Sequence, residues 1–235
     1  MSSPYLPTER NIFLEKLERG RFRITYNIWK RMIKRHLGDG ANYDSHLRMA
    51  DVGCGPGNYL CCLEAWFPKS EIFGIDPTEE LLAYASKRTK RARYLLNSAE
   101  NISMHSESVD VISVFQVVEH LQKPEAFFCE AARLLKLNGL LLLSTPNPGG
   151  IAAKILGTGW QGIRPDHISM KYPSEWHAML RKNKFVILDE GTTLFNGLPL
   201  IGRFPFGLPF QLAQATFGWF SWNKGESYMA VARKS

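Results

Sequence analysis

Two patterns of apolar and polar positions alternate along most of the chain. Short runs rich in aliphatic and β-branched residues are followed by longer segments in which apolar residues recur every three or four positions. The short runs predict strands and the longer segments predict helices. We expect strands at 47–52, 71–75, 93–96, 109–115, 138–144 and 184–190, helices at 58–66, 78–89, 123–136 and 173–182, and a last strand, SYMAVARK, at 227–234.

This alternation of strands and helices is typical of βαβ units, which form a parallel sheet through right-handed crossovers. No helical pattern separates the last two strands, so these two are expected to pair in the antiparallel direction at one edge. The sequence therefore predicts a doubly wound α/β fold. Its sheet has seven strands and is mostly parallel, with N-terminal helices before it and an antiparallel edge strand at the C-terminus.

The length of 235 residues and the apolar content of 45% suit one compact domain. Within 1–235 the pattern divides into a helical cap at 8–37, a core at 45–190 and an aromatic insertion at 194–222. No signal-peptide pattern and no apolar run of about 18 residues is present, and the four cysteines lack C-x-x-C spacing. These features favour the cytoplasm and leave open a peripheral contact with a membrane surface.

Three glycines follow the first predicted strand, in the stretch RMADVGCGPGNYL at 48–60. A glycine-rich turn between a strand and a helix can present backbone N–H groups to a ligand, although it can also be an ordinary tight turn. The next strand ends in Asp76, about 20 residues later, where a carboxylate can accept both hydroxyls of a ribose. Together the two features indicate a nucleoside-binding site.

A nicotinamide-dependent dehydrogenase would share this plan, but its fingerprint is G-x-G-x-x-G. Here Asn58 stands where the third glycine belongs, which disfavours that alternative. The segment from Asp51 to Gly57 instead resembles the D-x-G-C-G-x-G motif of class I S-adenosylmethionine-dependent methyltransferases. The resemblance continues in order through Asp76, the loop 97–100 and FQVVEHL at 115–121.

This resemblance implies a Rossmann-like methyltransferase fold over residues 45–190, with S-adenosylmethionine as cofactor and S-adenosylhomocysteine as product. Many relatives carry an acidic residue beside adenine, where this chain has Ser98. For Gln116, a solvated strand end is the alternative to a contact with the methionine end. The cofactor contacts that the resemblance implies are Asp51, Gly53, Cys54, Gly55, Gly57, Asn58, Asp76, Pro77, Ser98, Ala99, Glu100 and Gln116.

Within the superfamily, LLLLSTPNP at 140–148 and HISMKYPSEW at 167–176 are similar to the ubiquinone-biosynthesis type of O-methyltransferase and its small-molecule relatives. Those relatives often show E-x-x-E-H after the fourth strand, a pattern suited to a divalent metal. This chain has Gln116, Glu119 and His120 at the corresponding positions. Because one carboxylate is missing, we expect no metal.

The predicted acceptor is a small hydrophobic or aromatic molecule that is methylated on oxygen. The aromatic insertion supports an apolar acceptor if it forms a lid, but it can equally be extra core or a membrane or dimer contact. A net charge of +7 keeps nucleic acid open as an acceptor. The absence of a [DNS]-P-P-[YFW] motif argues against it. A scaffold that binds the cofactor without turnover is a further alternative, and no oligomeric state is predicted.

His167 is the predicted catalytic base, oriented by Asp166 or another carboxylate. It follows the turn after the fifth strand, from which it can approach the methyl donor on the acceptor side. His120 is the second candidate for this role. The alternative for His167 is a histidine that only packs at the rim of the pocket.

Overall fold

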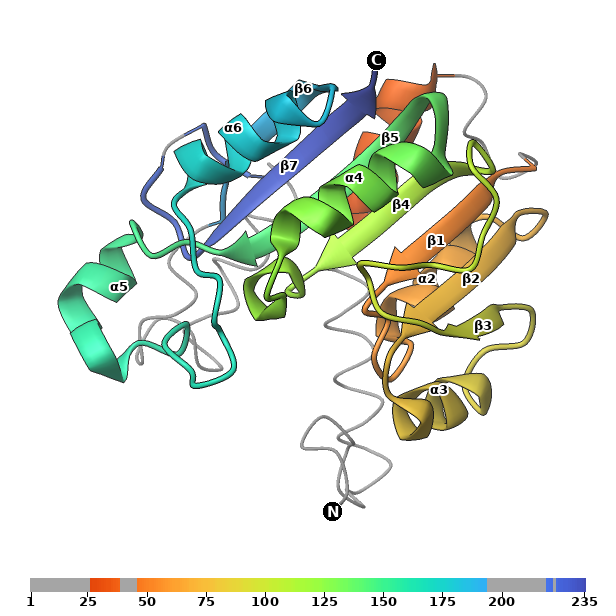
Figure 1. Cartoon of the computed structure of the whole chain (residues 1–235), viewed down its shortest axis with the longest axis horizontal. Coiled ribbons are helices and arrows are strands. Elements are labelled where there is room, and N and C mark those ends of the chain that lie inside the picture. The colour runs from red at the N-terminus through yellow and green to blue at the C-terminus, as the bar shows by residue number, and fades with distance from the viewer. Residues whose placement is uncertain (1–25, 39–45, 194–218, 222) are drawn as a thin grey trace.

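A seven-stranded sheet forms the centre of the computed structural model, which describes residues 26–38, 46–193, 219–221 and 223–235 (Figure 1). Residues 26–37 are helical and precede the sheet. The strands are β1 (Arg48–Val52), β2 (Glu71–Asp76), β3 (Arg93–Leu96), β4 (Val109–Phe115), β5 (Leu135–Pro146), β6 (Phe185–Thr192) and β7 (Ser227–Lys234). The later helices are α2 (Asn58–Trp66), α3 (Glu79–Ser86), α4 (Pro124–Leu134), α5 (Ile151–Leu156) and α6 (Pro173–Lys182), with short 3-10 turns η2 (Val118–His120) and η3 (Gly157–Gly159).

The strand order is β3-β2-β1-β4-β5-β7-β6. Strands β1 to β5 pair in parallel, and β7 runs antiparallel to both β5 and β6. The predicted doubly wound fold and its antiparallel pairing are confirmed. The prediction that the C-terminal strand lies at the edge is wrong, because β7 inserts between β5 and β6 and β6 forms the edge. The order reverses between β1 and β4, and ligands of open α/β sheets bind at the carboxyl ends of strands beside such a reversal.

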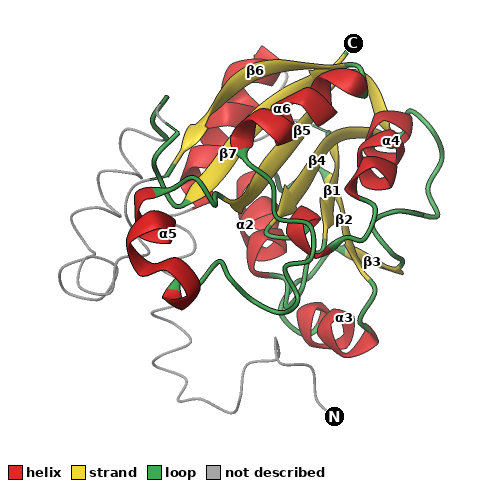
Figure 2. Ribbon diagram, turned by 60° about the vertical axis from the view of Figure 1, so that its left-hand side comes forward, coloured by secondary structure: helices red, strands yellow, loops and turns green. Residues whose placement is uncertain are grey.

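Helices cover both faces of the sheet (Figures 1 and 2). The helix at 26–37 and α2 pack on one face, where Trp29, Leu60 and Leu63 are almost fully buried. Helices α4 and α6 cover the other face with Phe128 and Trp176. Burial on both faces explains why β5 contains the uninterrupted apolar run 140–143 and why β1 and β4 are mainly apolar.

Two predicted helix ends differ from the structure, and β5 and β6 extend beyond the strands expected at 138–144 and 184–190. The helix expected at 123–136 ends at Leu134, and Leu135 already pairs with Val109 as the first residue of β5. The helix expected at 78–89 ends at Ser86. At α4 the apolar spacing of the helix continues through Leu135, whereas only polar residues follow Ser86 at 87–89, so the periodicity alone could not locate the last turn of either helix.

The helical cap and the aromatic insertion remain predictions in the parts that lie outside the described residues, at 8–25 and 194–218. The described end of the insertion packs on the fold. Trp219 donates its indole N–H to Asp189 Oδ1 at 3.0 Å, and its ring lies 5.2 Å from that of Trp29. Phe220 forms a backbone bridge with Thr192 of β6. This end of the insertion therefore joins the sheet edge to the N-terminal helix.

Candidate functional site

The glycine-rich loop turns directly after β1. The N–H groups of Gly53 and Cys54 both donate to the Ile75 carbonyl, at 2.7 and 3.0 Å, which holds the loop against the end of β2. Gly53 has a φ of +70°, and a Cβ there would lie 2.3 Å from a methyl group of Val117. Gly55 also has a positive φ, but no atom lies within 4 Å of its missing Cβ. The loop is therefore closed on its Val117 side and open at Gly55.

Two buried carboxylates lie beside this loop. Asp76, at the end of β2, accepts the Gly55 N–H on Oδ2 and the Thr78 N–H on Oδ1, each at 2.9 Å. Asp51 accepts the Ser113 hydroxyl on Oδ1 at 2.6 Å. Burial raises the pKa of Asp51 to about 7, and the charge of Asp76 adds to the rise. Within the described part of the chain neither carboxylate pairs with a lysine or arginine, so both suit a ligand that brings hydroxyl or cationic donors.

The remaining predicted cofactor residues lie at the same end of the sheet. The loop 97–100 begins where β3 ends, beside Asp76, and its Glu100 accepts the backbone N–H of Lys123. Gln116 has a φ of +57° and donates its side-chain amide to the Ser144 hydroxyl at 2.9 Å. Gln116 is exposed, so both the solvated strand end and a contact with the methionine end remain open for it. Asn58, Pro77 and Cys54 flank the glycine loop and Asp76 in the chain, and Cys54 is buried.

Sequence reasoning missed two tyrosines near Asp51. Tyr26 and Tyr59 pack with their ring centroids 5.0 Å apart, and both rings lie against Phe115 at the end of β4. Burial and the Asp51 charge raise the pKa of both hydroxyls. The Tyr59 hydroxyl is buried without a hydrogen-bond partner in the described structure. Because both residues follow apolar periodicity, their sequence pattern indicates only a core position.

A second group of side chains collects where β4 and β5 end. His120 and His167 lie edge to face with ring centroids 4.6 Å apart, although they are 47 positions apart in the sequence. His120 Nδ1 bonds to the Asp166 carbonyl at 2.9 Å, and His167 Nδ1 bonds to the Gly162 carbonyl at 2.7 Å. A carbonyl can only accept, so each Nδ1 carries the hydrogen and each neutral ring keeps its lone pair on Nε2.

The group that orients His167 is therefore a backbone carbonyl and not the carboxylate expected from the sequence. Asp166 directs its side chain elsewhere. Its oxygens accept from Arg164, at 3.0 Å each, and Oδ2 lies 3.4 Å from His120 Nδ1. Burial lowers the pKa of His167, which favours the neutral imidazole.

Glu119 completes this group from η2. Its side chain is fully buried, and Oε2 accepts the Thr145 hydroxyl at 3.0 Å while Oε1 has no partner among the described residues. Burial raises the pKa of Glu119 to about 7. Val117, which contacts Gly53, immediately precedes η2, so the two groups of side chains are neighbours.

Glu119, His120 and His167 are the described residues that could hold a metal ion, because each offers a ligand atom within 4.8 Å of the others. A carboxylate and two imidazoles suit a divalent cation such as Zn²⁺. The sequence pattern did not indicate this set, since His167 comes from a distant segment.

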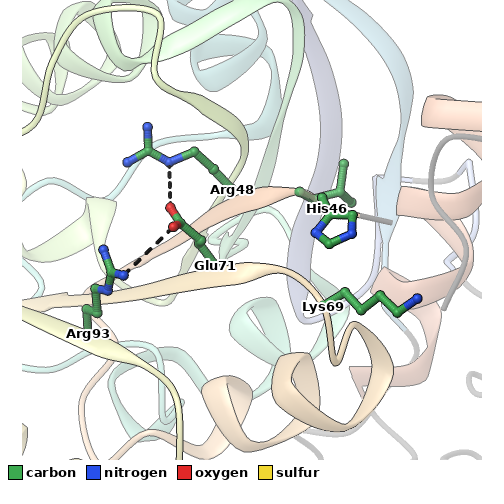
Figure 3. A pocket seen from close by; sticks show the side chains of 6 residues that line it. His46, Arg48, Lys69, Glu71 and Arg93 are labelled. Carbon is green, nitrogen blue, oxygen red and sulfur yellow. Dashed lines mark ion pairs between the residues drawn. The ribbon is translucent and has the colours of Figure 1, made fainter. Parts of the chain in front are cut away.

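An open hollow of about 550 Å³ lies elsewhere, at the amino ends of β1, β2 and β3 (Figure 3). The Glu71 carboxylate forms ion pairs with Arg48 Nε at 3.0 Å and with Arg93 Nη2 at 3.8 Å. His46 and Lys69 line the same hollow. Because it faces the end of the sheet opposite Asp76, this basic hollow is not part of the candidate site.

Comparison with known proteins agrees with the geometry. Residues 50–143, which contain the glycine loop, Asp76 and β4, match the model of the family described as a methyltransferase domain. A ubiquinone biosynthesis O-methyltransferase of Rhodopseudomonas palustris is 28% identical over 173 residues, which are 71% of this chain and 63% of that protein. These matches support a class I S-adenosylmethionine-dependent methyltransferase.

Two solved methyltransferases share the fold. A SAM-dependent methyltransferase of Aquifex aeolicus has a TM-score of 0.61 at 15% identity and covers 94% of this chain and 98% of its own. The plantazolicin methyltransferase, solved with S-adenosylhomocysteine, has a TM-score of 0.61 at 16% identity and covers 93% of this chain and 84% of its own. The chain spans just under two thirds of the length of the Rhodopseudomonas palustris protein described above.

The cofactor of this family, S-adenosylmethionine, fits the residues present. Its ribose hydroxyls and its ammonium are donors, and Asp76 and Asp51 are buried acceptors beside the loop. The open side of Gly55 leaves room for a ligand at the backbone.

No helix in the described ranges is long and apolar enough to cross a membrane.

Proposed function

We propose that this protein transfers a methyl group from S-adenosylmethionine to an oxygen atom of a small hydrophobic or aromatic acceptor. The observation that carries the proposal is the pair of imidazoles, His120 and His167, whose Nδ1 atoms are each bonded to a backbone carbonyl. His120 ends η2, which directly follows Val117, the residue that contacts Gly53. The name of the Rhodopseudomonas palustris relative supports oxygen as the methylated atom. The proposed setting is the cytoplasm, with contact at a membrane surface as a further possibility.

The cofactor is held by the glycine loop, the two carboxylates and the loop after β3. Asp51 would accept from its ammonium, and Asp76 would accept both ribose hydroxyls. The N–H groups of the glycine loop, at Gly53, Cys54, Gly55 and Gly57, already donate to oxygen atoms of the protein. Ser98, Ala99 and Glu100 border the adenine. When bound, the cofactor supplies an electrophilic methyl group on a sulfonium sulfur, which leaves as a neutral thioether when the methyl group departs.

His167 removes the proton from the acceptor hydroxyl while the new O–C bond forms. A phenol with a pKa near 10 and an imidazole near 6.5 differ by roughly 3.5 units, which is about 5 kcal/mol for complete transfer beforehand. Removal of the proton as the bond forms avoids this full cost, and such assistance typically accelerates a reaction about 10²-fold to 10⁴-fold. The Nδ1–H of His167 stays bonded to Gly162, so the ring keeps its orientation when Nε2 takes the proton.

Kinetics of His167→Ala test this role. We expect kcat to fall at least roughly 100-fold with the affinity for S-adenosylmethionine unchanged. His120→Ala is the matched control, because it removes the neighbouring imidazole and should reduce kcat less. A loss below about tenfold in His167→Ala, or the larger loss in His120→Ala, would move the role to His120 or to positioning alone.

Calorimetry with S-adenosylmethionine, S-adenosylhomocysteine and NAD tests the cofactor separately. Binding of NAD alone would contradict the proposal and favour a dehydrogenase. Binding of the first two without turnover on any acceptor would favour the non-catalytic scaffold. Transfer to RNA or DNA in preference to small molecules would favour a nucleic-acid methyltransferase.

A further inference from the structure

We infer that Trp160 and Glu226 are positioning residues that hold the His167 ring in its Nδ1–H form. Neither residue belongs to the cofactor site or to the imidazole pair. They reach His167 through Gly162, whose carbonyl accepts the Nδ1–H bond. The inference rests on the proposed function of His167 for its catalytic consequence, but not for its structural content.

The first contact is a buried hydrogen bond across the sheet end. The Trp160 indole N–H donates to Glu226 Oε2 at 2.8 Å, and both side chains are buried. Glu226 immediately precedes β7, whose first residue, Ser227, pairs with Pro146 at the end of β5. The carboxylate is therefore fixed to the sheet, and it holds the indole at one place. Loss of the acceptor would leave a buried N–H without a partner.

The second contact is between the indole and Gly162. A Cβ on Gly162 would lie 2.3 to 2.5 Å from three atoms of the six-membered ring of Trp160, so the ring lies directly against the Gly162 backbone. The Ile163 N–H also donates to the Trp160 carbonyl at 2.9 Å, which closes a turn around this ring. The position of the indole therefore sets the position of the Gly162 carbonyl.

The third contact is the 2.7 Å bond from His167 Nδ1–H to that carbonyl. A shift of the carbonyl would release Nδ1, and the ring could then place its hydrogen on Nε2. When the hydrogen is on Nε2, this nitrogen has no lone pair with which to take the proton of the acceptor hydroxyl. Correct orientation by a hydrogen-bonded partner is a general requirement for a histidine base.

Nitrogen NMR of the imidazole of His167 in the full-length protein tests the inference directly. The wild-type ring should be in the Nδ1–H form, and an Nε2–H ring would overturn the inference without any variant. In Trp160→Phe and in Glu226→Leu the Nε2–H form should appear. Glu226→Gln keeps an acceptor oxygen for the indole and should restore the wild-type form.

Trp176→Phe is the matched control. Trp176 is also fully buried, but its indole N–H has no partner in the described structure, and its ring packs with Phe128 in a core cluster that does not include Trp160. This variant should lose stability without a change in the tautomer of His167. If Trp160→Phe leaves the tautomer unchanged, or if Trp176→Phe changes it equally, the inference is wrong.

Turnover provides the second readout. We expect Trp160→Phe to lower kcat roughly 10-fold to 100-fold, as a displaced catalytic group does, with the affinity for S-adenosylmethionine unchanged. If His167→Ala keeps its activity, the proposed base fails, and the tautomer results still decide the positioning. If His167→Ala is inactive while Trp160→Phe has the wild-type tautomer and kcat, only the positioning fails.

Discussion

Removal of the Asp76 side chain should weaken the binding of S-adenosylmethionine more than any other single change at the glycine loop. Asp76 is 6% exposed, and each of its oxygens already accepts one backbone N–H, from Gly55 or Thr78. Each oxygen retains a lone pair for a ribose hydroxyl. The carboxylate therefore both shapes the loop and would bind the ligand.

The magnitude follows from these bonds. A hydrogen bond to a charged group contributes about 1.5–3 kcal/mol, and a water molecule can restore part of what Asp76→Ala removes. We expect a net loss of about 2–4 kcal/mol for two ribose bonds, which is a roughly 30-fold to 700-fold increase in Kd. Asp76→Asn keeps one acceptor oxygen and should have an intermediate Kd.

Calorimetry of the folded variants measures the effect, and Asp110→Ala is the matched control. Asp110 also accepts a backbone N–H, from Arg48 at 2.8 Å, and its other oxygen pairs with Lys136 at 2.8 Å. Because Asp110 lies at the amino end of β4, Asp110→Ala should lower stability without changing the Kd. A folded Asp76→Ala protein that binds within threefold of the wild type would remove Asp76 from the site.

Three further predictions concern stability and metal dependence. The pKa of Asp51 rises on folding from 3.8 to about 7, so stability relative to Asp51→Asn should fall as pH rises from 4 to 7 and stay level above it. That interval corresponds to about 4 kcal/mol, and urea unfolding of both proteins measures it; parallel curves would contradict the burial argument. Gly57→Ala should destabilise the fold by about 1–3 kcal/mol, because φ is +77° and its Cβ would lie 2.9 Å from that of Ala85. An unchanged denaturation midpoint would refute this. Methyl transfer should survive dialysis against EDTA, whereas a loss that Zn²⁺ or Mg²⁺ restores would identify Glu119, His120 and His167 as a metal site.

The parts of the fold that the sequence predicted are those that local patterns determine. Apolar runs located the strands, and the glycines before α2 together with Asp76 after β2 located the nucleoside side of the site. The end of α4 could not be predicted, because Leu135 continues the helical spacing and only its pairing with Val109 places it in β5. Non-local pairing overrides local propensity at such positions.

The acceptor side required the structure because its contacts join distant segments. Glu119 and His120 occur together in the sequence, but nothing local indicates that His167 lies against them. The orienting group of His167 is a backbone carbonyl, and a carbonyl leaves no residue-type signal to read. By contrast, Asp51 could be identified in the sequence from the D-x-G-C-G-x-G motif, and Asp76 from its place at the end of a predicted strand.

The proposed activity is tested most directly with S-adenosylmethionine that carries a ¹³C-labelled methyl group. The purified protein is incubated with this cofactor and a set of phenols, and the methyl carbon is followed by NMR. Our account predicts that the label appears as a methyl ether together with an equal amount of S-adenosylhomocysteine, and that His167→Ala forms far less of both. Label on nitrogen or carbon, or no transfer to any phenol by a protein that binds the cofactor, would contradict it.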